Sequence, residues 1–323
     1  MDQLIATARE RIQQWIIDYP ELQLWDEIPW QGATNQIFYG TRAGEAIVFK
    51  FFPRKVRKWQ EEHALRSLAT SGVVPRVYSY PSEEILVMQR LPGQMLYKAE
   101  KALTGEAWAN LYRQVGAGLA RLVQYAARPA DGKVANPYAI DHHMYAFWGS
   151  SFEEYFDEIL TTAQAALVRH QINEPVLHES VRNLLAARSE VLAYPVFMHV
   201  DDVHGANMLV DGDQFQGFID FEMSRLGNQL YLLGATLQWC CLDNPAQWAP
   251  LRAGYEEEQG TPFAPETLAL IKRFAPFQRW CRFAWYWGKD EQPDWVWRNN
   301  VRQTTVDSLL QVLAGVDATF DVR

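Results

Sequence analysis

The pattern of hydrophobic and polar positions divides the chain into a strand-rich first part and a helix-rich remainder. Residues 3–17 carry apolar side chains at helical spacing, which predicts an opening helix. Two later runs, QIFYGTRAGEAIVFKFFP and VPRVYSYPSEEILVMQRLPG, each predict two strands around turn residues. Between them, KWQEEHALRSLATSG predicts a helix closed near Gly72. The first part should therefore be a small, mostly antiparallel sheet with one inserted helix.

From Gly93 onward the pattern is mainly helical, broken by one hairpin near residues 208–220. The pair Pro92-Gly93, two residues that disrupt regular secondary structure, stands where the strand-like pattern ends and the helical pattern begins. It therefore marks a boundary between two lobes. We expect an α+β protein with an N-terminal lobe over residues 1–91, a hinge over 92–94 and a C-terminal lobe over 95–323. Residues 126–143 read as a loop or insertion.

Composition narrows the class of protein. A formal net charge of -9 argues against a nucleic-acid or anionic-membrane partner, which would need clustered Lys and Arg. No run approaches the roughly 20 apolar residues that span a membrane, and the charged N-terminus is unlike a signal peptide. Cys240, Cys241 and Cys281 lack metal-binding spacing, so we interpret them as reduced core thiols. These features predict a soluble, cytoplasmic protein and leave its oligomeric state open.

The stretch FMHVDDVHGANMLVDGDQFQGFIDFE places acids and an amide beside strand-like apolar residues. A hairpin turn centred between residues 213 and 214 would set Asn207 opposite Asp220, with Asp202 five residues before Asn207. Such oxygen ligands suit Mg²⁺. Alternatively these residues only cap turns, which explains Asp211 and Asp213 well but explains Asp220, at a strand end, poorly.

An Asp-x4-Asn spacing followed by a hairpin and a strand-terminal Asp resembles the catalytic loop of the kinase fold. More narrowly, HVDDVHGANMLVD and GFIDFE resemble the aminoglycoside phosphotransferase family, which includes choline kinase-like proteins and writes this region as HGDLHPGNVL and VIDWE. The resemblance implies a two-lobed protein-kinase-like fold. It also implies that Asp202 is the catalytic residue, that Asn207 and Asp220 are metal ligands, and that His204 matches the family's second His.

The chain departs from the family pattern around this loop. Val200 stands where the family has its first His, although a His occurs one place earlier at position 199. A pairing of His199 with Asp201 would change the spacing to the metal-binding Asn from five to six, so Asp202 is preferred. Two family acids further on become Asn228 and Leu232, so we expect the loop support to be rebuilt or weakened.

The first lobe holds counterparts of the family's nucleotide site. WQGATNQIFYG resembles its nucleotide loop, with Gly32, Thr34 and Asn35 in matching places. In EILVMQRLPG, Met88 would line the adenine pocket and the backbone near Arg90 would offer hydrogen bonds; an ordinary buried strand is the alternative.

Lys50 stands among apolar residues in a predicted strand, where a buried ammonium needs an anionic partner. An edge-strand Lys that blunts aggregation is the alternative reading. The following helix offers Glu61 or Glu62 as the partner, and the family pattern favours Glu61.

Together these features imply a kinase that moves the γ-phosphoryl group of ATP or GTP, with Mg²⁺, to a hydroxyl of a small molecule. Aminoglycoside-like, amino-alcohol and sugar acceptors remain open, and acids of the second lobe or its seven Trp residues between 239 and 297 are candidates to bind a cationic one. Core packing is the commoner role of such aromatic residues. A catalytically silent kinase-like module that binds nucleotide or a protein is the alternative, favoured by the changes at Val200, Asn228 and Leu232.

Overall fold

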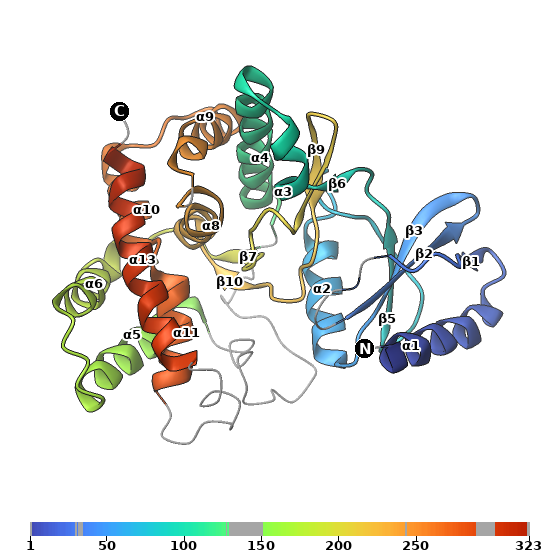
Figure 1. The fold of residues 1–323 in the computed structure, drawn as a ribbon, viewed down its shortest axis with the longest axis horizontal. Helices are drawn as coiled ribbons and strands as arrows, with labels where there is room; N and C mark the ends of the chain where they lie inside the picture. Colours follow the sequence, from blue (N-terminus) through green and yellow to red (C-terminus); the bar gives the residue numbers. More distant parts are fainter. Residues whose placement is uncertain are drawn as a thin grey trace.

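The computed structural model describes residues 2–29, 31, 35–126, 128, 151–242, 244–288 and 301–321, and it has two lobes (Figure 1). The N-terminal lobe is built on an antiparallel sheet with strand order β1-β2-β3-β5-β4. Its strands are β1 (Leu22–Leu24), β2 (Gln36–Arg42), β3 (Glu45–Phe51), β4 (Val77–Tyr78) and β5 (Ile85–Gln89). Both predicted strand pairs and the predicted α+β class are therefore confirmed, and β1 is an additional strand.

The two faces of this sheet pack against different helices. Alternate residues of the strands, among them Phe38, Ile47 and Phe49, form a separate apolar cluster with Ala8 and Ile12 of α1 (Asp2–Trp15). The opposite face packs towards α2 (Lys55–Ser67) and the second lobe, which share one apolar core. In Figure 1, α2 accordingly stands between the sheet and the second lobe. Period-two alternation along the strands thus decides which side chains face the lobe boundary.

Helix α2 ends earlier than its sequence pattern predicts. Its last residue is Ser67 and its C-terminal cap is Leu68, whose backbone N–H bonds to the carbonyl of Ala64. Gly72, with φ +71°, lies in the turn that follows instead of at the helix cap. Residues 68–71 favour turn geometry because Ala69 and Ser71 donate to carbonyls only three residues back.

The C-terminal lobe is mainly helical. Its longer helices are α4 (Gly105–Tyr125), α5 (Phe152–Arg169), α6 (Pro175–Ala186), α8 (Gln229–Thr236), α9 (Trp248–Gln259), α10 (Pro265–Phe274), α11 (Phe277–Trp287) and α13 (Val301–Asp321). Shorter helical turns are α3 (Leu96–Ala99), α7 (Arg188–Leu192), 3-10 turns at Ile16–Asp18 in the first lobe and at Glu100–Ala102 and Pro245–Gln247, and a π-helix at Leu237–Cys241. There are two small antiparallel sheets. One has the strand order β6 (Gln94–Met95), β8 (Met208–Asp211), β9 (Gln214–Phe218), and the other pairs β7 (Phe197–His199) with β10 (Arg225–Gly227).

The hairpin of β8 and β9 differs by one residue from the predicted register. Asp211 pairs with Gln214, so the turn is centred on Gly212 and Asp213, and Gly212 adopts φ +62°. The register then shifts between Leu209 and Val210. Consequently Asn207 faces Ile219, whose backbone N–H bonds to its carbonyl at 2.9 Å, and Asp220 lies one residue beyond the predicted pairing.

The segment between the lobes passes very close to this hairpin. Gly93 has φ +93°, and a Cβ placed on it would lie 2.1 Å from the carbonyl oxygen of Val210. Only glycine fits such a position, because a side chain would collide with backbone.

The structure also bears on two compositional predictions. Cys240, Cys241 and Cys281 are free thiols, as predicted, and burial raises their pKa values. Within the described parts of the chain, no helix is long and apolar enough to cross a membrane. Most of the predicted loop at 126–143 lies outside the described residues.

Candidate active site

Lys50 joins the two lobes through its ammonium group. It lies on β3, which is a central strand because β2 and β5 flank it, so the edge-strand reading of this lysine is wrong. Its side chain is 5% exposed, and Nζ lies 2.6 Å from Oε2 of Glu61 on α2 and 2.6 Å from Oδ1 of Asp220. Glu62 points elsewhere and pairs with Lys58 and Arg66.

The titration of this pair follows from its burial and its neighbours. Burial acts against the charge of Lys50, but the carboxylates of Asp220, Glu61 and Glu222 outweigh it and raise the pKa of the lysine. Burial raises the pKa of Glu61 to about 7, although the adjacent ammonium opposes that shift. Lys50 is therefore a permanent cation at neutral pH, while the proton on Glu61 responds to pH in the physiological range.

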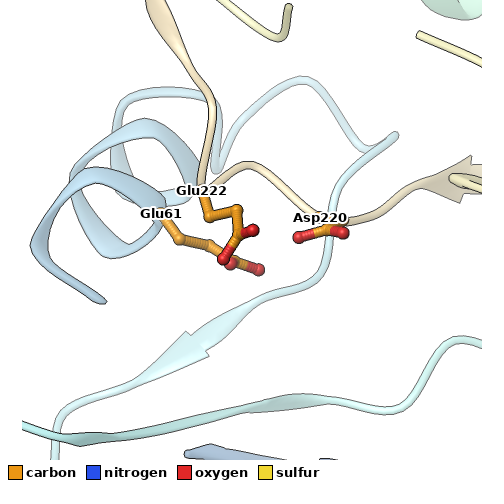
Figure 2. A group of neighbouring side chains, drawn as sticks. All are labelled: Glu61, Asp220 and Glu222. Carbon is orange, nitrogen blue, oxygen red and sulfur yellow. The ribbon is translucent and has the colours of Figure 1, made fainter. Parts of the chain in front are cut away.

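Glu222 adds a third carboxylate, and Figure 2 shows it beside Glu61 and Asp220. Oxygen atoms of the three groups lie within 4.8 Å of one another. Glu222 accepts hydrogen bonds from Arg57 of α2 and from the side-chain amide of Asn35, both in the first lobe. Because each of the three acids pairs with Lys50 or Arg57, we interpret the cluster as an ion-pair network between lobes.

The predicted nucleotide loop is described only in part. Asn35 is buried and its amide donates to Glu222, whereas Gly32 and Thr34 lie outside the described residues. Met88 is 5% exposed and packs in the core shared by the lobes. The backbone N–H of Arg90 donates to Ala46 at 3.2 Å, and its guanidinium lies 3.8 Å from the ring centroid of Tyr39. Contact of Met88 and Arg90 with adenine stays a prediction.

The loop between β7 and β8 brings Asp202 and Asn207 together. The amide Nδ2 of Asn207 donates to the carbonyl of Asp202 at 2.9 Å, which ties the two ends of the loop. The carboxylate of Asp202 is 34% exposed and lies 3.4 Å from Nε2 of His204. An accessible carboxylate beside a cleft can accept a proton from a bound hydroxyl group.

Asp220 follows β9 in an unusual backbone conformation. Its φ of +66° is left-handed, which costs a non-glycine residue of order 1 kcal/mol or more. The conformation aims its carboxylate at Lys50 instead of letting the strand continue. Backbone strain of this kind is typical of functional sites.

Magnesium fits the donor atoms present here. Asn207 uses Nδ2 for its bond to Asp202, and within the described residues its amide oxygen has no hydrogen-bond partner. Asp220 uses Oδ1 for Lys50 and keeps a second carboxylate oxygen. Hard oxygen donors of this type, few in number, suit an ion that retains several waters. The assignment of Asn207 and Asp220 as its ligands stays a prediction.

At the positions where the sequence departs from the family pattern, the side chains have structural roles. His199 is buried, its Nδ1 lies 2.8 Å from the carbonyl of Val200, and burial lowers its pKa to about 4. Asn228 caps α8, since its side-chain oxygen accepts from two backbone N–H groups at 3.1 Å each. Leu232 is buried in the core. These positions therefore hold a buried imidazole, a helix cap and a core side chain, and whether the loop support is rebuilt or weakened stays a prediction.

Sequence reasoning missed the side chains that hold the loop from behind. Asp201 is buried and its Oδ2 lies 2.7 Å from Nη2 of Arg225, whose Nη1 donates to the hydroxyl of Tyr155 at 2.7 Å. Gln278 on α11 donates to the carbonyl of Asp201 at 2.7 Å. The signal for the first pair was an acid in place of the family's Gly, together with an Arg in SRLG; the position of Gln278 gave none.

Comparison with known proteins places this geometry in context. No curated protein sequence matches the chain significantly. Among solved structures, a GDP complex of a mutant aminoglycoside 2'-phosphotransferase IIIa superposes with a TM-score of 0.63 at 14% identity, covering 96% of this chain and 97% of that one. Choline kinase LicA from Streptococcus pneumoniae gives 0.56 at 17% identity, covering 94% and 98%.

A macrolide 2'-phosphotransferase, MphH from Brachybacterium faecium, gives a TM-score of 0.54 at 12% identity, covering 93% of this chain and 97% of that one. At such identities these similarities show a shared kinase-like fold. The sequence profile of the phosphotransferase enzyme family, however, matches residues 27–271 of this chain. That match spans strands β2 to β5 of the first-lobe sheet and the whole segment from Asp202 to Asp220, and the chain belongs to the phosphotransferase enzyme family.

Proposed function

We propose that the protein transfers the γ-phosphoryl group of ATP or GTP, with Mg²⁺, to a hydroxyl group of a small molecule. The observation that carries the proposal is the position of the Lys50 ammonium, held 2.6 Å from both Glu61 of the first lobe and Asp220 of the second. Phosphoryl transfer relies on placing fixed charges around the phosphates, and this arrangement supplies one cation and its orienting acids at the lobe boundary. Similar structures include complexes with GDP and with streptomycin and ATP, so the nucleotide base stays open.

Each side chain has a definite role in this proposal. Lys50, oriented by Glu61, contacts the α- and β-phosphates. Magnesium held through Asn207 and Asp220 would neutralise negative charge on the phosphates. The accessible carboxylate of Asp202 orients the acceptor hydroxyl and takes its proton as the oxygen–phosphorus bond forms.

The test combines nucleotide binding with turnover. We expect ATP or GTP to raise the thermal unfolding temperature only with Mg²⁺, and ADP or GDP release to depend on a hydroxylated acceptor. Asp202→Asn should lower kcat about 100-fold or more while nucleotide binding persists. Asp211→Asn is the matched control, because Asp211 is exposed at the end of β8, just after the loop that holds Asp202, and the change removes the same charge.

Two outcomes would contradict the proposal. Nucleotide binding without turnover, alike in the wild type and in Asp202→Asn, would identify a silent kinase-like module. Stabilisation by nucleotide that persists in Lys50→Met would mean that the ammonium between Glu61 and Asp220 is not the phosphate anchor.

A further inference from the structure

Beside Asp202 lies a pocket whose far wall is formed by α11. Its lining includes Asp202, Gln278, Arg282 and Trp285. If Asp202 receives the acceptor's proton, as the proposed function requires, the rest of the acceptor occupies this pocket. The charges of the residues that line the pocket therefore indicate the charge of the acceptor that it binds.

The α11 side of the pocket is basic although the chain as a whole carries a formal charge of -9: Arg282 lines the pocket, and Arg279 lies outside the lining, three residues earlier on the same helix. Arg279 and Arg282 are three residues apart on α11, and both guanidinium groups lie over the ring of Trp239, at 4.5 Å and 5.6 Å from its centroid. Neither forms an ion pair with any residue that the structure describes, and Nε of Arg279 is buried without a hydrogen-bond partner there. Burial and then the charge of Arg282 lower the pKa of Arg279 to about 10, which still leaves it protonated at neutral pH.

Two like charges at this helical spacing repel each other, and this repulsion destabilises the pair unless an anion lies nearby. Asp202 offers one negative charge, and Asp201 is already bound to Arg225. A ligand oxyanion would complete the balance, because guanidinium groups bind carboxylate or phosphate oxygens in pairs.

The same walls do not suit a cationic acceptor. The ring of Trp239 is occupied by the two guanidinium groups, so it is not free to receive a ligand ammonium. Of the acids of the second lobe that could bind a cationic acceptor, Glu256 pairs with Arg252, Glu258 with Arg121 and Glu222 with Arg57, while Glu257 is exposed on α9 and does not line this pocket. Asp243, Asp290, Glu291 and Asp294 lie outside the described residues.

We propose that the acceptor is an anionic hydroxyl compound, whose carboxylate or phosphate group binds Arg282 while its hydroxyl lies at Asp202, with the charge of Arg279 adding to the attraction. In the reaction the bond from the γ-phosphorus to the β,γ-bridging oxygen breaks, and the nucleoside diphosphate leaves with that electron pair. A bond forms from phosphorus to the acceptor oxygen, whose proton passes to Asp202.

A charge series on constant carbon skeletons tests the proposal. The acceptors are glucose, gluconate, glucose 6-phosphate and glucosamine, together with glycerol, glycerate, glycerol 3-phosphate and serinol. Acceptor-dependent release of nucleoside diphosphate and calorimetric binding in the presence of Mg-ADP are measured for each. We expect the anionic members to bind and turn over preferentially, and the carboxylate and phosphate arms to tell which oxyanion is preferred.

Variants then assign the effect to the basic α11 side of the pocket. Arg282→Glu should raise KM for the preferred anion at least tenfold, the loss expected for a charge-assisted bond, with KM for the nucleotide unchanged. Arg273→Glu on α10 is the matched control, because Arg273 is exposed and contributes to no part of the pocket lining. Arg282→Ala, a milder change, guards against misfolding of the charge reversal.

The proposal is overturned if neutral or cationic members outperform the anions, or if Arg282→Glu raises KM equally for every member. It is also overturned if no anion binds while Mg-nucleotide binding is intact. A failure of the proposed kinase function gives a different result: either Mg-nucleotide does not bind, or Asp202→Asn does not lower kcat.

Discussion

Replacing Arg225 by Met isolates the energetic role of the buried pair behind the loop between β7 and β8. The side chains of Arg225 and Asp201 are 9% and 7% exposed, and their charged atoms are 2.7 Å apart. Methionine keeps most of the volume but leaves the carboxylate of Asp201 buried without its cation. Breaking a buried ion pair in this way costs about 3–5 kcal/mol. At about 2 °C per kcal/mol for a chain of this size, the unfolding temperature should fall by roughly 6–10 °C.

The assay is thermal unfolding followed by circular dichroism, with two comparisons. Arg188→Met removes an Arg that pairs with Glu153 and Asp157 at the surface, and its expected cost is below about 1 kcal/mol. The double variant Asp201→Asn/Arg225→Met removes both charges and should recover part of the lost stability. Equal unfolding temperatures for the Arg225 and Arg188 variants, or a double variant no more stable than Arg225→Met, would refute the reasoning.

Three further outcomes follow from the geometry. Because the pKa of Glu61 is about 7, kcat/KM for the nucleotide should rise with pH through that value as the acid ionises and holds Lys50, and Glu61→Gln should abolish the rise; a pH–rate profile checks this. His199 has a lowered pKa of about 4, so the unfolded state takes up a proton before the folded state does as pH falls from 6.5. Stability should drop across that window, and His199→Gln should remove up to about 3 kcal/mol of the drop in denaturant titrations at several pH values. Gly93→Ala should destabilise by several times the roughly 1 kcal/mol expected of Gly44→Ala, which has the same backbone sign but open space around it.

The sequence predicted the architecture well because strands and helices leave periodic patterns of apolar residues. The strand pair around Lys50 and the hairpin after Asn207 both occur where those patterns place them. The predicted end of α2 was wrong by a few residues, and the predicted register of the hairpin was wrong by one. Both depend on local turn geometry, around Gly72 and Gly212 respectively. Such turns leave little trace in hydrophobic periodicity.

The candidate site was predictable only where side chains are close in sequence or match a family motif. Nothing in the sequence indicates that Gln278, far along the chain, holds the backbone of Asp201, or that Arg282 lines a pocket together with Asp202. Those contacts depend on how α11 packs in the second lobe, which is a tertiary property. The same limit applies to Glu256 and Glu258, which were only candidates to bind an acceptor and form ion pairs with Arg252 and Arg121.

The buried pair of Asp201 and Arg225 constrains the order in which its two members could have arisen during descent. An aspartate arriving first at position 201 would be enclosed without a counter-ion and strongly selected against. An arginine arriving first at position 225 would already have the hydroxyl of Tyr155 as a hydrogen-bond acceptor. Lineages that carry the arginine with a small residue at 201 should thus outnumber those with the reverse combination, and ancestral reconstruction can count them.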